Sequence, residues 1–269
     1  MKKNKIYSII AILIVVAIYT YDYCQNSKAQ SIIVETGKTS KENTNAYFLP
    51  TSTTNQIIHH QNYSLSYSEP HEQAEWVAYE LKASHLSYTI HKRPYFEIDK
   101  SVKTGAAHWR NYKSSGYDKG HLCPAGDRRY TKKAHDETFL TSNVSPQKHK
   151  FNSGLWNRLE KKVRYWARKN DEIFVVTGGV LKKGLKTIGD EDVSVPNQFY
   201  KVILNNTNGK IKVLAFLMNH QDSDLPLYKF VVSIDEIEAL TGIDFFPELE
   251  DTIEDRLEAS SSYKRWSFN

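Results

Sequence analysis

Sulfur-containing residues are scarce in this sequence: its 269 residues include two cysteines and two methionines. Cys24 and Cys123 form no CxxC pair, so a zinc knuckle and a disulfide framework are both excluded. Cys123 precedes Pro124 and is expected to be a small packed side chain, with a thiol nucleophile as the minor alternative. No internal repeat is present. The fold must therefore rest on an ordinary hydrophobic core.

An apolar run long enough for a comfortable membrane span is also missing. Thirteen uncharged residues, Ile6 to Ile18, follow the basic start MKKNK. This run is shorter than the about 20 residues of a spanning helix and suits a signal peptide. Ser27 and Ala29 are the small residues that a cut after Ala29 requires. Residues 1–29 are predicted to be a signal peptide or an N-terminal membrane anchor, tethered through residues 6–20. A signal peptide and a membrane anchor both predict export, to a secreted, periplasmic or surface-anchored location.

The rest of the chain divides into a linker and one domain. Residues 30–55 are polar, rich in Thr and Asn and aperiodic, which is typical of a linker. Residues 56–269 have ordinary globular composition, and the whole chain is 40% hydrophobic and 12% aromatic. One large domain over 56–269 is therefore predicted.

Charge is unevenly distributed along that domain. Residues 108–169 hold fifteen Lys or Arg against five Asp or Glu, a net charge of +10. Residues 233–258 hold ten acidic groups against Arg256 alone. These segments are either two solvated helical faces or a basic surface for a polyanion with an acidic segment elsewhere.

The hydrophobic pattern predicts both helices and strands. Residues 151–170 carry an apolar helical stripe of Leu155, Leu159, Val163 and Trp166. Residues 172–180 suggest a buried strand, and Asn208-Gly209 marks the turn of a hairpin. The other predicted elements are a strand at 63–69, a helix at 69–86 with Ala74, Val77 and Leu81 at helical spacing, extended chain at 87–99, loops at 101–130 and a short helix at 233–246 stopped by Gly242. Adjacent hairpins without βαβ alternation predict an α+β fold with a mixed or antiparallel central sheet flanked by helices.

Two clusters of polar residues could carry chemistry. Asp118-Lys119-Gly120-His121 reads as a turn that presents a histidine, and histidine titrates near neutral pH and suits general-base catalysis. On the predicted helix, Asn152, Trp156, Glu160 and Arg164 recur every four residues and share one edge. The structural alternative for the helix is an Asn cap plus a Glu160–Arg164 ion pair.

Taken together, these blocks resemble the DNA/RNA non-specific endonuclease family, the ββα-metal nucleases. The stretch DKGHLCPAGD (118–127) is similar to the family motif Asp-Arg-Gly-His with its Pro-containing loop. ETFLTSNVSPQ (137–147) and FNSGLWNRLEKKVR (151–164) resemble the second and third blocks, and later segments extend the resemblance over Tyr63 to Leu249. The resemblance implies an α+β fold with a ββα-metal active-site core and DNA and RNA as substrates. A homodimer is one assembly that it leaves open.

The same resemblance implies roles for individual residues. His121 would be the general base, and Asn152 would be the direct protein ligand of one Mg²⁺, with Mn²⁺ as a substitute. Glu160 would hold metal-bound waters, and Arg164 would face phosphate oxygens. The remaining two matches are Asn143, which would support the site, and Lys119, which would also face phosphate.

Lys119 departs from the family pattern, which has Arg at this position. An ammonium is a point charge, whereas a guanidinium can grip phosphate with two hydrogen bonds. This departure supports the alternative function, a catalytically inactive nucleic-acid-binding module of the same fold. A thiol hydrolase built on Cys123 and His121 is a weaker alternative, since no third orienting group is evident.

Overall fold

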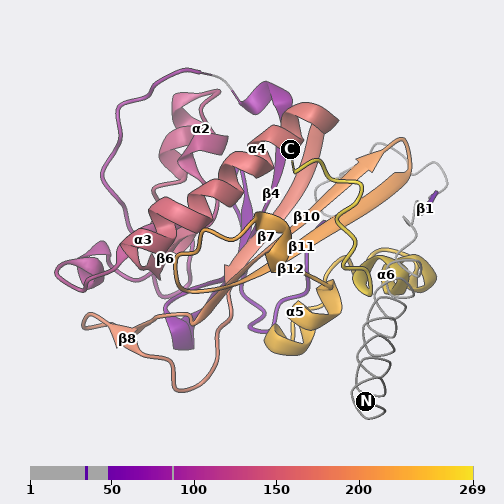
Figure 1. The fold of residues 1–269 in the computed structure, drawn as a ribbon. Coiled ribbons are helices and arrows are strands. Elements are labelled where there is room, and N and C mark those ends of the chain that lie inside the picture. Colours follow the sequence, from indigo (N-terminus) through magenta and orange to yellow (C-terminus); the bar gives the residue numbers. More distant parts are fainter. Residues whose placement is uncertain (1–33, 36–47, 87, 269) are drawn as a thin grey trace, which may run out of the picture.

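The computed structural model describes residues 34–35, 48–86 and 88–268 (Figure 1). The predicted export segment, 1–29, lies outside the described residues. Within the described part of the chain, no helix combines the length and apolar character that crossing a membrane requires.

The fold is built on an antiparallel sheet. Its strands lie in the order β1-β11-β10-β7-β4-β3-β2, and β12 pairs with β11. Every strand pairing in it is antiparallel, which confirms the predicted α+β class. The strands are β1 (Val34–Glu35), β2 (Ile57–His59), β3 (Ser64–Ser68), β4 (Gln73–Lys82), β7 (Glu172–Gly179), β10 (Gln198–Thr207), β11 (Lys210–Asn219) and β12 (Val231–Val232).

Helices cover both faces of this sheet (Figure 1). On β7, Ile173 and Val175 join one hydrophobic core, which includes the predicted stripe of α4 (Asn157–Asn170). Phe174 and Val176 point the other way into a second core, which includes residues of α5 (Ile234–Thr241) and α6 (Asp251–Glu258). Successive side chains of a strand point to opposite faces, so a strand covered on both sides is apolar throughout.

The predicted helix at 69–86 is wrong, because residues 73–82 form the strand β4. Val77, Tyr79 and Leu81 alternate toward the α4 side, whereas Trp76 and Ala78 face the other core. Because β4 is buried on both faces, apolar residues occupy most of its positions. Such a run also contains apolar residues at helical spacing. Packing between two strands thus outweighed the helix propensity of Ala, Glu, Leu and Lys.

The predicted helix at 151–170 is confirmed, with one irregularity. It consists of α3 (His149–Phe151), a π-helical turn (Asn152–Trp156) and α4. At the π turn Asp222 Oδ1 accepts a hydrogen bond from Leu155 N at 2.9 Å. A Cβ on Gly154 would lie 2.2 Å from that same oxygen, so only glycine admits the carboxylate. π turns of this kind are frequent at functional sites.

Three other predictions are confirmed. Residues 172–179 form β7, and β10 and β11 form the hairpin around Asn208-Gly209. The helix α5 ends at Gly242, which has a φ of 72°. The segment 87–99 forms no strand in its described part.

The described part of the predicted linker packs on the domain. Phe48 is buried in the α5–α6 core. Thr51 N donates to the carbonyl of Asp244 at 2.9 Å, and Asp244 N donates to Thr51 Oγ1 at 2.9 Å. The folded unit thus includes residues 48–55, ahead of the predicted boundary at 56.

Two antiparallel strand pairs lie outside the main sheet. One pairs β5 (Asp118–His121) with β6 (Val144–Gln147) across the connection 122–143 and is called the β5–β6 hairpin below, and the other pairs β8 (Thr187–Ile188) with β9 (Val193–Ser194). The 118–121 stretch, expected to be a turn, is therefore a strand. The remaining helix, α2 (Lys132–Glu137), begins after Thr131, whose side chain accepts a hydrogen bond from Ala134 N.

Candidate active site

The hairpin β5–β6 carries the histidine of the first cluster. Lys119 and His121, two residues apart on β5, both reach Phe96: Lys119 Nζ lies 5.3 Å from the ring centroid, and the His121 centroid lies 5.5 Å from it. The His121 ring also meets Phe139 edge-on at 5.0 Å. Residues i and i+2 of a strand share one face, which explains this grouping.

The environment of His121 keeps its ring neutral. Burial, then the charge of Arg93 and then His135 lower the pKa of His121 to about 3. Its Nε2 has no hydrogen-bond partner among the described residues, and protein atoms cover it. The expected presentation of His121 to water is thus replaced by a neutral ring between two aromatic side chains.

Asn143 fixes the chain that follows His121. Its Oδ1 accepts from Cys123 N at 2.8 Å, and its Nδ2 donates to the carbonyls of Cys123 (2.9 Å) and Thr138 (2.8 Å). The carbonyl of Asn143 accepts from Leu122 N at 2.9 Å. The side chain is fully buried and satisfied, so Asn143 is a positioning residue for the loop after β5.

Cys123 itself is a packed side chain. It is fully buried, and burial raises the pKa of its thiol to about 12. The thiolate is the reactive form, and at neutral pH it is not populated here. The thiol-hydrolase alternative loses its nucleophile.

Asp118 ties the hairpin to the start of the long helix. Its Oδ2 accepts from Asn152 Nδ2 at 3.0 Å and faces His149 Nδ1 at 2.9 Å. The amide of Asn152 is therefore oriented with its nitrogen toward Asp118, and Oδ1 is the atom left to bind a ligand. A single neutral oxygen suits a hard cation that keeps most of its waters, as Mg²⁺ does. The residues present fit a magnesium site at Asn152.

The other end of the helix edge is an ionic network. Arg164 Nη1 donates to Asp127 Oδ1 at 2.8 Å and lies 3.9 Å from Glu160 Oε2. Asp127 Oδ2 accepts from Tyr79 at 3.0 Å. Arg164 is thus held by carboxylates, and its contact with phosphate stays a prediction. The long helix is thus joined to β5 through Asp118 and to the loop after β5 through Asp127.

Lys201 is a member of this network that the sequence analysis missed. It is fully buried in β10, its Nζ has no hydrogen-bond partner among the described residues, and it lies 4.8 Å from the Trp156 ring. Burial raises the pKa of Glu160, and the charges of Lys201 and Arg164 oppose that rise. Burial likewise lowers the pKa of Lys201, and the charge of Glu160 opposes that fall. A lysine inside an apolar strand was the available signal.

Arg93 and Gln147 were also missed. Arg93 lies over the rings of Phe96 (5.7 Å) and Phe139 (5.5 Å), the same rings that contact His121. Gln147 is buried, and neither of its amide atoms has a hydrogen-bond partner in the part of the chain that the structure describes; a Cβ on Gly120 would lie 2.2 Å from its Oε1. Glycine at 120 thus admits the Gln147 side chain against β5. No spacing rule identifies either residue, because Arg93 acts on His121 through a tertiary contact and Gln147 reaches β5 through strand pairing.

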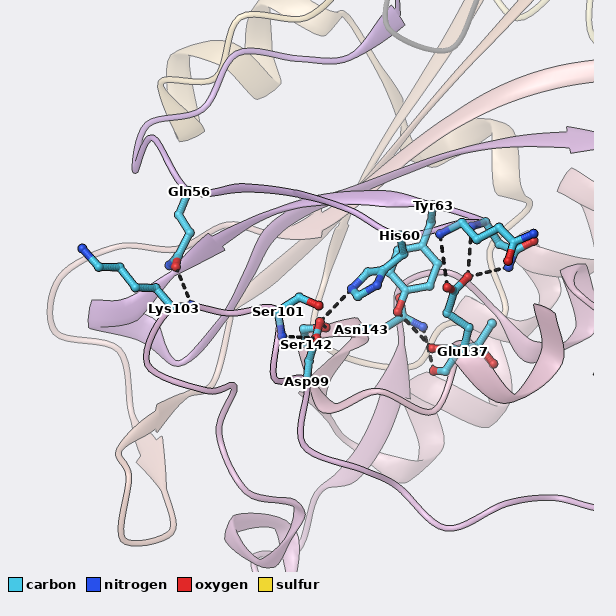
Figure 2. A network of polar contacts seen from close by, with 12 residues as sticks. Gln56, His60, Tyr63, Asp99, Ser101, Lys103, Glu137, Ser142 and Asn143 are labelled. Carbon is cyan, nitrogen blue, oxygen red and sulfur yellow. Dashed lines mark hydrogen bonds and ion pairs between the residues drawn. The ribbon is translucent and has the colours of Figure 1, made fainter. Parts of the chain in front are cut away.

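A second polar network holds the turn that precedes β6. Figure 2 shows Asp99 between Ser142, His60 and Ser101. Its carboxylate accepts from Ser142 Oγ at 2.6 Å and Ser101 N at 2.9 Å, and it faces His60 Nε2 at 2.7 Å. Ser142 immediately precedes Asn143, so this network fixes the turn that carries the Asn143 amide.

Replacing Asp99 by alanine should lower the free energy of unfolding by about 3 kcal/mol, because it leaves the buried Ser142 hydroxyl, the half-buried His60 ring and the Ser101 amide without their common partner. Burial raises the pKa of Asp99, but the hydrogen bonds with His60 and Ser142 lower it by a larger amount. The net pKa of Asp99 therefore lies below its usual range. The carboxylate therefore stabilises the fold above its unfolded pKa of about 3.9, and this contribution is lost as the pH falls. Urea unfolding at neutral and acidic pH measures the effect. The exposed Asp190→Ala should change stability by less than about 0.5 kcal/mol, and an equally small change for Asp99→Ala would contradict the account.

Known proteins resemble this chain over most of its length. The family described as DNA/RNA non-specific endonuclease matches residues 40–252. Mitochondrial nuclease EXOG of Danio rerio is 35% identical over 206 residues, 70% of this chain and 60% of that protein. Human mitochondrial endonuclease G is 34% identical, covering 72% and 70% of the two chains, and a nuclease of Nostoc sp. is 31% identical, covering 76% and 78%.

A solved structure agrees with these relatives. A chain in the crystal structure of the EndoG/EndoGI complex, which addresses the mechanism of EndoG inhibition, superposes with a TM-score of 0.70 at 30% identity. The match covers 80% of this chain and 95% of that one. The chain spans about 60% of the length of the Danio rerio relative.

Proposed function

The chain belongs to the DNA/RNA non-specific endonuclease family, and on that premise we propose that it is an exported, metal-dependent nuclease hydrolysing phosphodiester bonds of DNA and RNA. The observation that carries the proposal is the neutral, unpaired Nε2 of His121 on the hairpin that Asp118 joins to Asn152. Little sequence preference follows from binding through phosphates, since phosphate contacts carry no base information.

His121 accepts a proton from the attacking water. The unprotonated ring is the form that can do so, and its surroundings favour that form. The side chain of Phe96 or Arg93 has to turn aside for Nε2 to reach the water, and Arg93 is on the exposed segment 88–98 that can allow this. Asn143 holds the backbone just beyond His121 and so limits the drift of the ring.

Asn152 Oδ1 would hold the Mg²⁺, with Glu160 facing the waters of the ion. A bound Mg²⁺ neutralises charge on the phosphate and on the departing 3′ oxygen. Asp118 keeps the Asn152 amide turned toward the site. Arg93 raises the positive potential beside His121, and Lys119, which lies over the neighbouring Phe96 ring, adds a second positive charge that favours a bound phosphate.

Digestion of closed circular substrates tests the proposal. The chain from Gln30 onward is incubated with plasmid DNA and with circular single-stranded RNA, in Mg²⁺ or in EDTA. We expect linear and then shorter fragments of both in Mg²⁺ and none in EDTA, because a circle has no end for an exonuclease. Intact circles in every lane, from folded protein that still binds them, would replace the proposal by a binding module.

The pH dependence of the free enzyme follows from the environment of His121. Because its pKa is lowered, the ring stays unprotonated until the pH falls to about 3. We therefore expect the His121 ring resonances in NMR spectra to be unchanged between about pH 5 and 8, the range in which a free histidine titrates. A titration of His121 with a midpoint above about 6 would contradict the neutral-base assignment.

A groove beside the hairpin suits a single strand. It has a volume of about 700 Å³ and is lined by residues on either side of Trp109 and by the β8–β9 turn. The lining includes Arg110, Lys113 and Lys186 together with Asp190 and Glu191, whereas Trp109 itself lies next to the lining residues His108 and Arg110. Trp109 is 37% exposed, and Arg110 lies 5.4 Å from its ring. Basic side chains around an exposed aromatic ring are the features with which proteins bind unpaired bases and their phosphates.

Trp109→Ala should raise KM for single-stranded DNA about 5- to 150-fold, since stacking of one base contributes about 1–3 kcal/mol, and leave kcat within about twofold. Steady-state kinetics on a labelled oligonucleotide measure both constants. Tyr165→Ala is the matched control, because Tyr165 on α4 is also 37% exposed but has no neighbour in the chain among the residues that line the groove. Equal KM values for the two variants would exclude Trp109 as a stacking surface for the substrate.

A further inference from the structure

The acidic segment of the chain folds into a compact cluster on the face of the sheet opposite α4. Figure 1 shows α5 and α6 next to each other, away from α4. Both helices contribute to the second core, whereas α4 belongs to the first. Whatever this cluster does, it does apart from the candidate active site.

Five carboxylates converge there, in two groups that share Glu258. Asp244, Glu254 and Glu258 each place one oxygen within 4.8 Å of the others, and Asp235, Glu238 and Glu258 do the same. Glu258 is 6% exposed, and its Oε1 is covered and without a hydrogen-bond partner among the described residues. Glu254 Oε1 is likewise covered and unpaired. Asp244 is exposed and opens the cluster to solvent.

Among the described residues this charge is little compensated: Glu238 Oε1 accepts a hydrogen bond from Phe245 N at 2.8 Å. None of the ion pairs formed within residues 48–86 and 88–268 involves the five carboxylates. Burial, together with the charges of Glu238, Glu254 and Asp244, raises the pKa of Glu258 to about 9. Buried acceptors without partners and like charges at this distance both disfavour the folded state. A bound cation would remove both costs.

We propose that Asp244, Glu254 and Glu258 bind one Ca²⁺ ion between α6 and the loop after α5, with Glu238 beside it. Oxygens that share one Ca²⁺ lie at about 2.3–2.6 Å from it and hence within about 5 Å of each other, which the measured spacing satisfies. Carboxylates on two separate segments form a flexible set, which suits Ca²⁺ better than the strictly octahedral Mg²⁺. Water completes the coordination on the exposed side at Asp244.

The ion would fasten α6 to the domain. Asp244 is bonded to Thr51 through its backbone, and its neighbours Phe245 and Phe246 are buried in the core with Leu257 of α6. A link from Asp244 to Glu254 and Glu258 would join these segments. Its effect is on stability, so it can be measured without any nuclease assay.

Calcium titration by calorimetry, and thermal unfolding with and without Ca²⁺, test the proposal. Both use the Asn152→Ala background, which disables the candidate catalytic site. We expect one ion bound per chain and a rise in Tm of about 4 °C or more at saturating Ca²⁺. Glu258→Gln should abolish both effects. Glu248→Gln, an exposed acidic position with the same change in charge, should retain them.

A chain that binds no Ca²⁺, and whose Tm is unchanged by it, would overturn the proposal. In that case the carboxylates share protons, and Glu258→Gln should raise Tm in metal-free buffer by relieving repulsion. Retained Ca²⁺ binding in Glu258→Gln would also overturn it. If that variant does not fold, Asp244→Asn at the exposed edge takes its place, with the same expected loss of binding.

Discussion

His121→Ala should lower kcat on plasmid DNA by about 10²- to 10⁴-fold, the usual contribution of a general base. The ring that is removed holds the unpaired Nε2 and is surrounded by Phe96 and Phe139. KM should change little, because phosphate binding depends on the neighbouring positive charges. Initial rates at saturating substrate, measured in Mg²⁺, give kcat directly.

The matched control for this variant is His59→Ala. His59 is an exposed histidine on β2, an edge strand of the main sheet, whereas β5 and β6 form a separate sheet, and its loss should leave kcat within about twofold. Normal turnover by His121→Ala would remove His121 from the mechanism. A loss of kcat in both variants would point to damage to the fold instead.

Asn152→Ala should raise the Mg²⁺ concentration needed for half-maximal activity by at least about tenfold and reduce the maximal rate. The variant deletes the amide oxygen assigned to the ion, and a cation held by a single protein ligand cannot keep its place without it. It also removes the hydrogen bond to Asp118. A Mg²⁺ titration of the initial rate at fixed substrate separates the metal requirement from the maximal rate.

Asn157→Ala is the control for the metal ligand. Asn157 lies five residues further along the same helix, and its Nδ2 donates to the carbonyl of Ser153 at 3.2 Å. The substitution has the same size and should leave the Mg²⁺ titration unchanged. An unchanged titration for Asn152→Ala would show that the ion is bound elsewhere.

The sequence predicted the parts of the site that follow local rules. The helical stripe around Leu159 and the turn at Asn208-Gly209 depend on neighbours in the chain, and both are confirmed. The strand at 73–82 was missed because burial on both sheet faces erases the alternation that identifies a strand. The π turn at 152–156 depends on Asp222, about 70 residues away, and no local pattern signals it.

The candidate site likewise combines residues that local patterns identify with residues that only tertiary contacts bring together. The motif around His121 and the helix edge at Asn152 could be identified from the order of residue types alone. Arg93 and Lys201 could not, because an exposed loop and a buried strand bring them to the site from distant positions. The pairing of Arg164 with Asp127 likewise appears only when the loop after β5 is placed against α4.

Rescue of His121→Ala by added imidazole tests the central claim most directly. If His121 Nε2 accepts the proton of the attacking water, a free imidazole in the space left by the ring should restore a measurable part of kcat. The restored rate should rise with imidazole concentration in His121→Ala and stay unchanged in Asn152→Ala. No restoration in His121→Ala at any concentration, or equal stimulation of both variants, would contradict the assignment of His121 as the base.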